Sequence, residues 1–284
     1  MDKEMRLDAL LVERGLISGR DRAKELIAKG LVLVDGAPAD KPAQKCSCGA
    51  ALELLGQEAH YVSRAAAKLR EALDSFSLSL EGKTVLDVGA STGGFTQCAL
   101  ERGAKRVYAV DVGRDQLAPV LREDPRVMDL QQTDIRLLRA EQLPETPDFA
   151  ACDVSFISLT KVLGPVKALL ADDGQIVCLI KPQFEAGREK VGKKGVVRDL
   201  AVHKEVMEQV ITYAKSLGFL IKGLDFSPIR GPEGNIEYLL YIQKMENGAA
   251  TFPEDEWNEW QKVMDETIQA AQEHAVKHAE DISG

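Results

Sequence analysis

The chain has 284 residues, of which 45% are hydrophobic, which suffices for one large domain or for one large and one small domain. No apolar run approaches the ~18 residues of a membrane span, and charges interrupt the N-terminal segment, so neither a membrane helix nor a signal peptide is expected. The five cysteines contain no C-x-x-C pair, which argues against a disulfide framework or a zinc site and favours the reducing cytoplasm.

The net charge of −9 is unevenly distributed along the chain. Residues 249–284 carry nine carboxylates against two lysines, and the remainder of the chain is close to neutral. A nearly neutral body can still present a local basic face to phosphates. The overall acidity therefore does not exclude a nucleic-acid partner.

Residues 1–60 are expected to form a small α+β domain. Leucines at regular spacing predict a first helix that ends near Gly15, and Ser18 is placed to cap a second helix that ends at Gly30. Apolar runs at 31–34 and 51–55 predict two strands, and Asp35-Gly36 after the first run predicts a tight turn. The polar face of the second helix carries four cations, which are either solvated or in contact with RNA: Arg20, Arg22, Lys24 and Lys29.

This order of elements resembles the alpha-L RNA-binding module first described in a ribosomal small-subunit protein. The resemblance covers residues 5–55 and rests on Arg6, Leu7, Asp8, Leu11, Gly15, Ser18, Arg22, Ala23, Ile27, Gly30, Val32, Val34 and Gly36. It implies that the module holds a folded RNA through its backbone and shape. Arg6 and the four cations of the second helix are the implied contacts.

Strand and helix patterns alternate over residues 61–248. The predicted strands are 84–88, 106–110, 127–130, 149–153, 175–180, 219–226 and 236–242, and the predicted helices are 61–76, 95–102, 159–170, interrupted at Pro165, and 200–217. Residues 227–235 leave no room for a helix, so the last two strands must be antiparallel. The pattern predicts an α/β fold, a Rossmann-like, doubly wound, mostly parallel seven-stranded sheet. Residues 249–284 are predicted to form an acidic helical extension.

A glycine-rich turn between the first of these strands and the next helix reads D-x-G-x-x-x-G-G, from Asp87 to Gly94. It departs from the G-x-G-x-x-G pattern of dinucleotide sites. An acidic residue before the first glycine suits a ligand with a positive amino group, and we expect S-adenosylmethionine. The expected contacts are Asp87, Gly89, Ser91, Gly93, Gly94 and Phe95.

Carboxylates also follow the next two strands. Asp111 is placed to accept hydrogen bonds from both ribose hydroxyls of a nucleoside cofactor, with Val112 beside it. Asp134 and Ile135 lie in the region of adenine contacts, although an ordinary surface turn is an equally good interpretation there.

The fourth and fifth strands end in Asp153 and Lys181, which should therefore lie together beside the glycine turn. A simple ion pair would also account for a lysine at the end of an apolar strand. Glu237 begins the reversed strand, at the same edge of the sheet, and is expected to join Lys181. Asp153 is expected to contact the cofactor as well.

Four motifs, D-V-G-A-S-T-G-G-F, Y-A-V-D-V-G, D-V-S-F-I-S-L and L-I-K-P-Q-F-E, together with the N-terminal module, resemble the TlyA family of haemolysin-named rRNA methyltransferases over residues 5–243. The resemblance implies FtsJ-type ribose 2′-O-methyl transfer, with cytidine as the nucleotide, and the catalytic tetrad Lys68, Asp153, Lys181 and Glu237. Without it, Lys68 would be an ordinary solvated lysine. The family usually has glycines after Arg64, where this chain has three alanines.

The predicted activity is therefore S-adenosylmethionine-dependent methylation of rRNA, free or in ribosomal subunits. Lys181 would position and deprotonate the hydroxyl, while the other tetrad residues tune its charge and hold the geometry. A basic segment, 181–198, and the helix before the sheet supply further RNA contacts: Arg64, Arg188, Lys190, Lys193 and Lys194. No metal and no membrane partner are expected, and the oligomeric state stays open.

Two other functions are alternatives to RNA methylation. A membrane-lytic protein would fit the haemolysin name, but the tail is acidic, the wrong sign for anionic lipid. A non-catalytic RNA-binding factor in ribosome assembly would not need the tetrad beside a cofactor turn.

Overall fold

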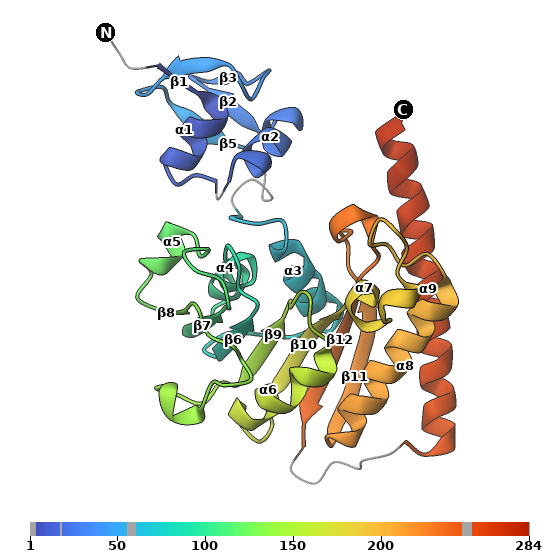
Figure 1. Ribbon diagram of the computed structural model, residues 1–284. Coiled ribbons are helices and arrows are strands. Elements are labelled where there is room, and N and C mark those ends of the chain that lie inside the picture. The colour runs from blue at the N-terminus through green and yellow to red at the C-terminus, as the bar shows by residue number, and fades with distance from the viewer. Residues whose placement is uncertain (1–3, 18, 56–60, 246–251, 284) are drawn as a thin grey trace.

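The computed structural model describes residues 4–17, 19–55, 61–245 and 252–283. The expected cap Ser18 and the junction at 56–60 lie outside these ranges. Figure 1 shows a small N-terminal unit set apart from a larger body with a central sheet, and a long C-terminal helix along one side of that body.

The N-terminal unit folds around the two predicted helices, α1 (Leu7–Glu13) and α2 (Arg20–Ala28). It has two small antiparallel sheets, one of β1 (Glu4–Arg6) and β4 (Lys45–Ser47), the other of β3 (Ala37–Pro38), β2 (Val32–Val34) and β5 (Leu52–Leu54). The predicted turn joins β2 to β3, and both Asp35 and Gly36 have positive φ angles, as a two-residue hairpin requires. Leucines of both helices fill a separate core beneath the strands.

The larger body contains a seven-stranded sheet in the order β11-β12-β10-β9-β6-β7-β8. Its strands are β6 (Thr84–Val88), β7 (Arg106–Val110), β8 (Val127–Leu130), β9 (Phe149–Cys152), β10 (Gln175–Ile180), β11 (Phe219–Phe226) and β12 (Tyr238–Lys244). Only β12 runs against its neighbours, β10 and β11, within this sheet. The predicted mostly parallel α/β sheet with one reversed strand is confirmed.

Helices cover both faces of the sheet because successive strand residues point to opposite sides. On one face, Val85 and Val177 pack with α3 (Ala66–Ser75) and α4 (Gly94–Glu101), near the short α5 (Pro119–Arg122). On the other, Leu86 and Ile176 pack with α6 (Leu163–Leu169) and α8 (Leu200–Ser216). The C-terminal helix α9 (Glu254–Ser283) lies against β11 and α8 (Figure 1), which confirms the predicted helix.

Three predicted boundaries are wrong in ways that affect the site. The break in the third predicted helix lies at Val162, between the 3₁₀ turn η3 (Leu159–Lys161) and α6. Pro165 falls in the first turn of α6, where its missing N–H costs nothing. Glu237 precedes β12 instead of starting it, and α3 begins at Ala66, after a turn over residues 61–65.

Further one-turn elements connect these helices and strands: η2 (Ala140–Gln142), α7 (Pro182–Glu185), η4 (Arg188–Lys190) and η5 (Pro232–Gly234). In the part of the chain that the structure describes, no helix is both long and apolar enough to cross a membrane.

Candidate active site

The glycine turn after β6 is shaped by close backbone packing. Gly89 has a φ of +87°, and a Cβ there would lie 2.6 Å from the carbonyl oxygen of Asp153. Gly93, with a φ of +97°, faces the side chains of Leu117 and Leu121, and a Cβ on Gly94 would lie 3.0 Å from that of Ser63. Glycine is thus needed at these positions to bring the ends of β6 and β9 together and to seat α4.

A cavity of about 710 Å³ opens at the carboxyl ends of β6, β7, β8 and β9. This volume is in the range of small-molecule sites. Seven of the predicted cofactor residues line it: Gly89, Ser91, Asp111, Val112, Asp134, Ile135 and Asp153. The structure places the other four, Asp87, Gly93, Gly94 and Phe95, outside the lining of this cavity. They are packing residues behind it, and a direct cofactor contact by them stays a prediction.

Two of the carboxylates of the cavity wall are oriented by backbone amides and by a neighbouring arginine. Asp111 accepts hydrogen bonds from the N–H groups of Ser91, at 2.8 Å, and Gly113, at 2.7 Å. Asp134 is paired with Arg136 at 2.6 Å, and this hydrogen-bonded guanidinium lowers the pKa of Asp134. Val112 is 73% exposed and provides an apolar surface beside Asp111. Two fixed acceptors around apolar side chains fit a nucleoside.

Asp87 is fully buried at the end of β6. Its Oδ2 accepts a hydrogen bond from Thr96 Oγ1 at 2.6 Å, while its Oδ1 has no hydrogen-bond partner among the described residues. Burial raises the pKa of this carboxyl to about 7. Its unpartnered Oδ1 is a buried acceptor behind the glycine turn, of the kind that an amino group could satisfy.

The four predicted catalytic residues meet at the edge of this cavity. Asp153 Oδ1 lies 2.5 Å from Lys181 Nζ, and Asp153 Oδ2 lies 3.4 Å from Lys68 Nζ. Lys68 Nζ lies 2.6 Å from Glu237 Oε2. Glu237 therefore pairs with Lys68. The expectation that Glu237 would join Lys181 is wrong. Residues far apart in the sequence thus form a chain of alternating charges.

The charged side chains of this cluster are buried, and burying charged groups costs free energy. Lys68 and Lys181 are each 6% exposed and Glu237 is 1% exposed. Burial opposes ionisation of Asp153, but the two neighbouring ammonium groups outweigh it and hold the pKa of Asp153 below its ordinary value. Two cations and two anions stabilise one another in a site from which water is largely excluded.

Three neighbours of the tetrad were not predicted. Ser155 Oγ lies 3.2 Å from Lys181 Nζ, and Gln183 Nε2 donates to Glu237 Oε1 at 3.3 Å. Phe156 is 91% exposed, has a φ of +62° and contacts the ring of Phe184, with centroids 4.9 Å apart. The sequence feature that could have indicated Phe156 is an aromatic residue within a polar segment that follows a strand. A backbone outlier that carries an exposed ring on the cavity wall makes Phe156 a candidate for contact with a substrate.

The predicted RNA contacts fall into separate regions. The basic helix α2 does not present one face: Arg22 and Lys29 line a cleft toward the larger body, whereas Arg20 and Lys24 lie on the other side of the helix. Several of the cations are paired with nearby carboxylates: Arg6 with Asp8, Arg22 with Glu25, Lys24 with Asp21, Lys29 with Glu25 and Lys190 with Glu205. The side chains of Arg64, Arg188, Lys193 and Lys194 are exposed. Their contact with RNA stays a prediction.

The described residues contain no group of three or more His, Cys, Asp or Glu side chains that could hold a metal ion.

Comparison with known proteins identifies the family of both parts of the chain. Residues 61–244 match the family of FtsJ-like methyltransferases, and residues 5–50 match the S4 domain. The chain belongs to the FtsJ-like methyltransferase family. The predicted resemblance, for both the catalytic body and the N-terminal module, is confirmed.

Relatives align with this chain along most of their length. The chain is 44% identical over 250 residues to the 16S/23S rRNA (cytidine-2′-O)-methyltransferase TlyA of Mycobacterium tuberculosis, an alignment that covers 88% of this chain and 93% of that protein. It is 40% identical to Hemolysin A of Brachyspira hyodysenteriae, over 84% of this chain and 99% of the relative. A solved structure described as a hemolysin, from Streptococcus thermophilus, has a TM-score of 0.76 and 42% identity, over 99% of this chain and 100% of that one.

Proposed function

We propose that this FtsJ-like methyltransferase transfers a methyl group from S-adenosylmethionine to a ribose 2′-hydroxyl of ribosomal RNA, at a cytidine. The observation that carries the proposal is the buried Lys68–Glu237 and Asp153–Lys181 cluster at the rim of a nucleoside-sized cavity. Relatives named as rRNA (cytidine-2′-O)-methyltransferases support the choice of substrate. An rRNA substrate would place the enzyme in the cytoplasm.

Asp111 and Asp134 would hold the nucleoside part of S-adenosylmethionine, and Asp87 would favour its amino group from behind the glycine turn. The bound cofactor would supply an electrophilic methyl group. We assign cofactor binding and catalysis to residues 61–248, RNA binding to residues 1–60, and a structural extension to residues 249–284.

The tetrad would supply the proton chemistry. A 2′-hydroxyl is a weak nucleophile that must lose its proton as the O–C bond forms. Lys181, held by Asp153 and Ser155, is the group placed to take that proton, and it does so in its neutral form. Lys68 pairs with the other oxygen of the same carboxylate. Glu237 in turn pairs with Lys68 and holds its ammonium group beside Asp153.

The test is single-turnover methyl transfer to rRNA by Lys181→Ala and Lys181→Arg, with cofactor binding measured in parallel. Both variants should lose at least ~10²–10⁴-fold in rate and keep most of their cofactor affinity, because neither side chain can act as a base. Lys215→Ala is the matched control: Lys215 is also buried and paired, with Glu256 at 3.3 Å, but it lies at the contact between α8 and α9. It should keep the wild-type rate.

A Lys181→Arg enzyme at wild-type rate would remove the base role, and a Lys181→Ala enzyme at wild-type rate would remove Lys181 from the mechanism. Failure of the wild-type protein to methylate free rRNA or either ribosomal subunit, read by mass spectrometry, would overturn the proposed activity. Leakage of dye-loaded vesicles by that same protein would support the membrane-lytic alternative instead.

A further inference from the structure

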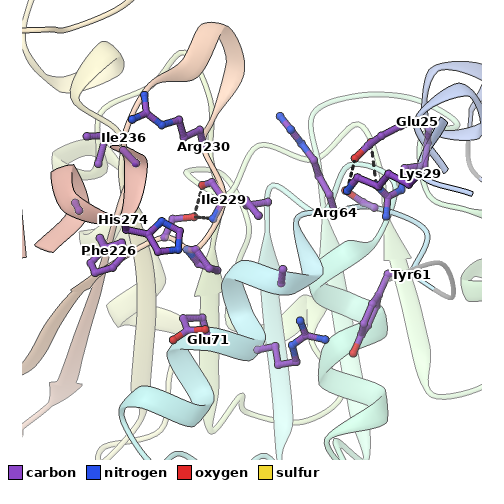
Figure 2. Close-up of a pocket in the computed structure, with 18 residues that line it drawn as sticks. Glu25, Lys29, Tyr61, Arg64, Glu71, Phe226, Ile229, Arg230, Ile236 and His274 are labelled. Carbon is purple, nitrogen blue, oxygen red and sulfur yellow. Dashed lines mark hydrogen bonds and ion pairs between the residues drawn. The ribbon is translucent and has the colours of Figure 1, made fainter. Parts of the chain in front are cut away.

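A second cavity, of about 460 Å³, lies between the N-terminal unit and the larger body. Four segments form its walls: α2, the turn and first part of α3, the connection between β11 and β12, and α9. Figure 2 shows Arg230 and His274 on one side of this interdomain cleft, Glu25 and Lys29 on the other, and Arg64 between them in that view. The cleft exists only because both parts of the chain contribute to it.

The interdomain cleft is locally basic in an acidic protein. Its lining includes five cations and two carboxylates: Arg22, Lys29, Arg64, Arg70 and Arg230 against Glu25 and Glu71. The whole chain, by contrast, carries a net charge of −9. A concave surface with a surplus of guanidinium groups attracts phosphates and concentrates them.

Two of the arginines are the best placed to bind a ligand. Arg64 is exposed, and no carboxylate among the described residues forms an ion pair with its guanidinium. Arg230 donates to the carbonyl oxygen of Gly234 at 2.8 Å, within its own loop, and the described residues offer it no carboxylate either. Arg22 and Lys29, in contrast, are both paired with Glu25.

The floor of the interdomain cleft adjoins the catalytic tetrad. Arg64 precedes Lys68 by four residues and lies in the turn that leads into α3. Ile236 lines the cleft and is followed directly by Glu237, and Gly231 packs against the Glu237 side chain so closely that a Cβ would overlap it. One tetrad residue, Asp153, also lines the cofactor cavity, together with Phe156. A strand that delivers its 2′-hydroxyl to Lys181 therefore has this basic cleft beside it.

We propose that the interdomain cleft holds the sugar–phosphate backbone of the RNA next to the target nucleotide, with Arg64 and Arg230 binding its phosphates. This inference rests on the proposed function. It assigns a role to Arg230 and to the β11–β12 connection, neither of which the sequence suggested. It also accounts for the position of the S4 unit: RNA bound to this unit would cross the cleft before it enters the active site.

The test compares Arg64→Gln, Arg230→Gln and the double variant with Lys222→Gln, which removes an exposed cation from β11 outside the cleft. Affinity for in-vitro-transcribed 16S and 23S rRNA is measured at salt concentrations from about 50 to about 300 mM, together with S-adenosylmethionine affinity and the KM for RNA. Each single variant should bind RNA about ten-fold more weakly and the double variant about a hundred-fold. The slope of log affinity against log salt should fall by roughly 0.7–0.9 for each phosphate that the variant no longer neutralises. Cofactor affinity should not change.

Arg230→Lys separates charge from loop structure. It keeps the cation, so it should restore most of the RNA affinity that Arg230→Gln removes if the residue binds phosphate. Wild-type RNA affinity and salt slope in the double variant, or an equal weakening in Lys222→Gln, would overturn the inference and leave the proposed activity standing. If the wild-type enzyme transfers no methyl group to RNA, the proposed function itself has failed.

Discussion

The buried carboxyl of Asp87 should make the methyltransferase body less stable as the pH rises. Burial raises the pKa of Asp87 to about 7 in the folded protein, whereas an unfolded aspartate has a pKa near ~4. Between these values the folded state holds a proton that the unfolded chain has released. The free energy of unfolding therefore falls with increasing pH across this window, and the contribution is complete above the folded pKa.

The magnitude can be isolated with Asp87→Asn. Each pH unit between the two pKa values costs about 1.4 kcal/mol, so from about pH 5 to about pH 8 the wild type should lose about 3 kcal/mol through this group. Asparagine cannot titrate, and its carbonyl oxygen can still accept from Thr96. Its amide would occupy the unpartnered Oδ1 position, at a cost of about 1–3 kcal/mol that does not depend on pH. Relative to wild type, the variant should gain about 3 kcal/mol over the same pH range.

The assay is urea unfolding of both proteins at unit steps from about pH 5 to about pH 8 without cofactor, with the same m-value required of both. Asp172→Asn is the control, because that side chain is 83% exposed and its substitution should give a difference from wild type that is independent of pH. If the Asp87→Asn difference were constant to within about 0.5 kcal/mol over the range, the reasoning would be refuted. The carboxyl would then be ionised in the folded protein even at the acid end of the range.

Three further substitutions test other parts of the site. Lys68→Met should destabilise the protein by about 3–5 kcal/mol in urea unfolding, because it leaves the buried Glu237 without its cation; Lys215→Met, which leaves a more exposed carboxylate, should cost less. Asp111→Asn should weaken S-adenosylmethionine binding about ten- to a hundred-fold by calorimetry, and unchanged affinity in a folded variant would exclude Asp111 from the cofactor site. Phe156→Gly should stabilise the fold by about 1 kcal/mol by relieving the positive φ, yet lower kcat/KM for RNA at least ten-fold; full activity would show that the ring does not contact substrate.

The sheet was predictable because its central strands, such as β6, β9 and β10, are short apolar runs that are buried on both faces. The turn at Asp35-Gly36 and the position of Lys181 at a strand end follow from local rules of the same kind. The short strands β1, β3 and β4 were not predictable, since E-M-R, A-P and K-C-S carry no apolar run of the kind that marks the equally short β2 and β5.

The partners within the site could not be predicted because they depend on strand order. The sequence indicated that Asp153, Lys181 and Glu237 share one edge of the sheet. It did not show that α3 packs against β12, which brings Lys68 to Glu237. The placement of the α2 cations was also only partly predictable. Helical spacing separates Arg22 from Arg20, but only the position of the N-terminal unit beside the larger body decides which of them lines the interdomain cleft.

The distribution of buried charge separates function from stability in this protein. A buried ion pair rarely stabilises a fold more than an apolar pair of the same size. Stability alone therefore does not explain a buried cluster of four charged side chains. Here Asp153 lines a cavity with fixed acceptors for a nucleoside, and Lys68 and Glu237 each directly follow a residue that lines the cleft with exposed arginines. Lys215 gives the contrast: it is as buried as Lys181, but it is one cation matched by one carboxylate at a helix contact. At the sheet edge two buried lysines share one carboxylate, and within the described parts of the chain only this cluster has that arrangement.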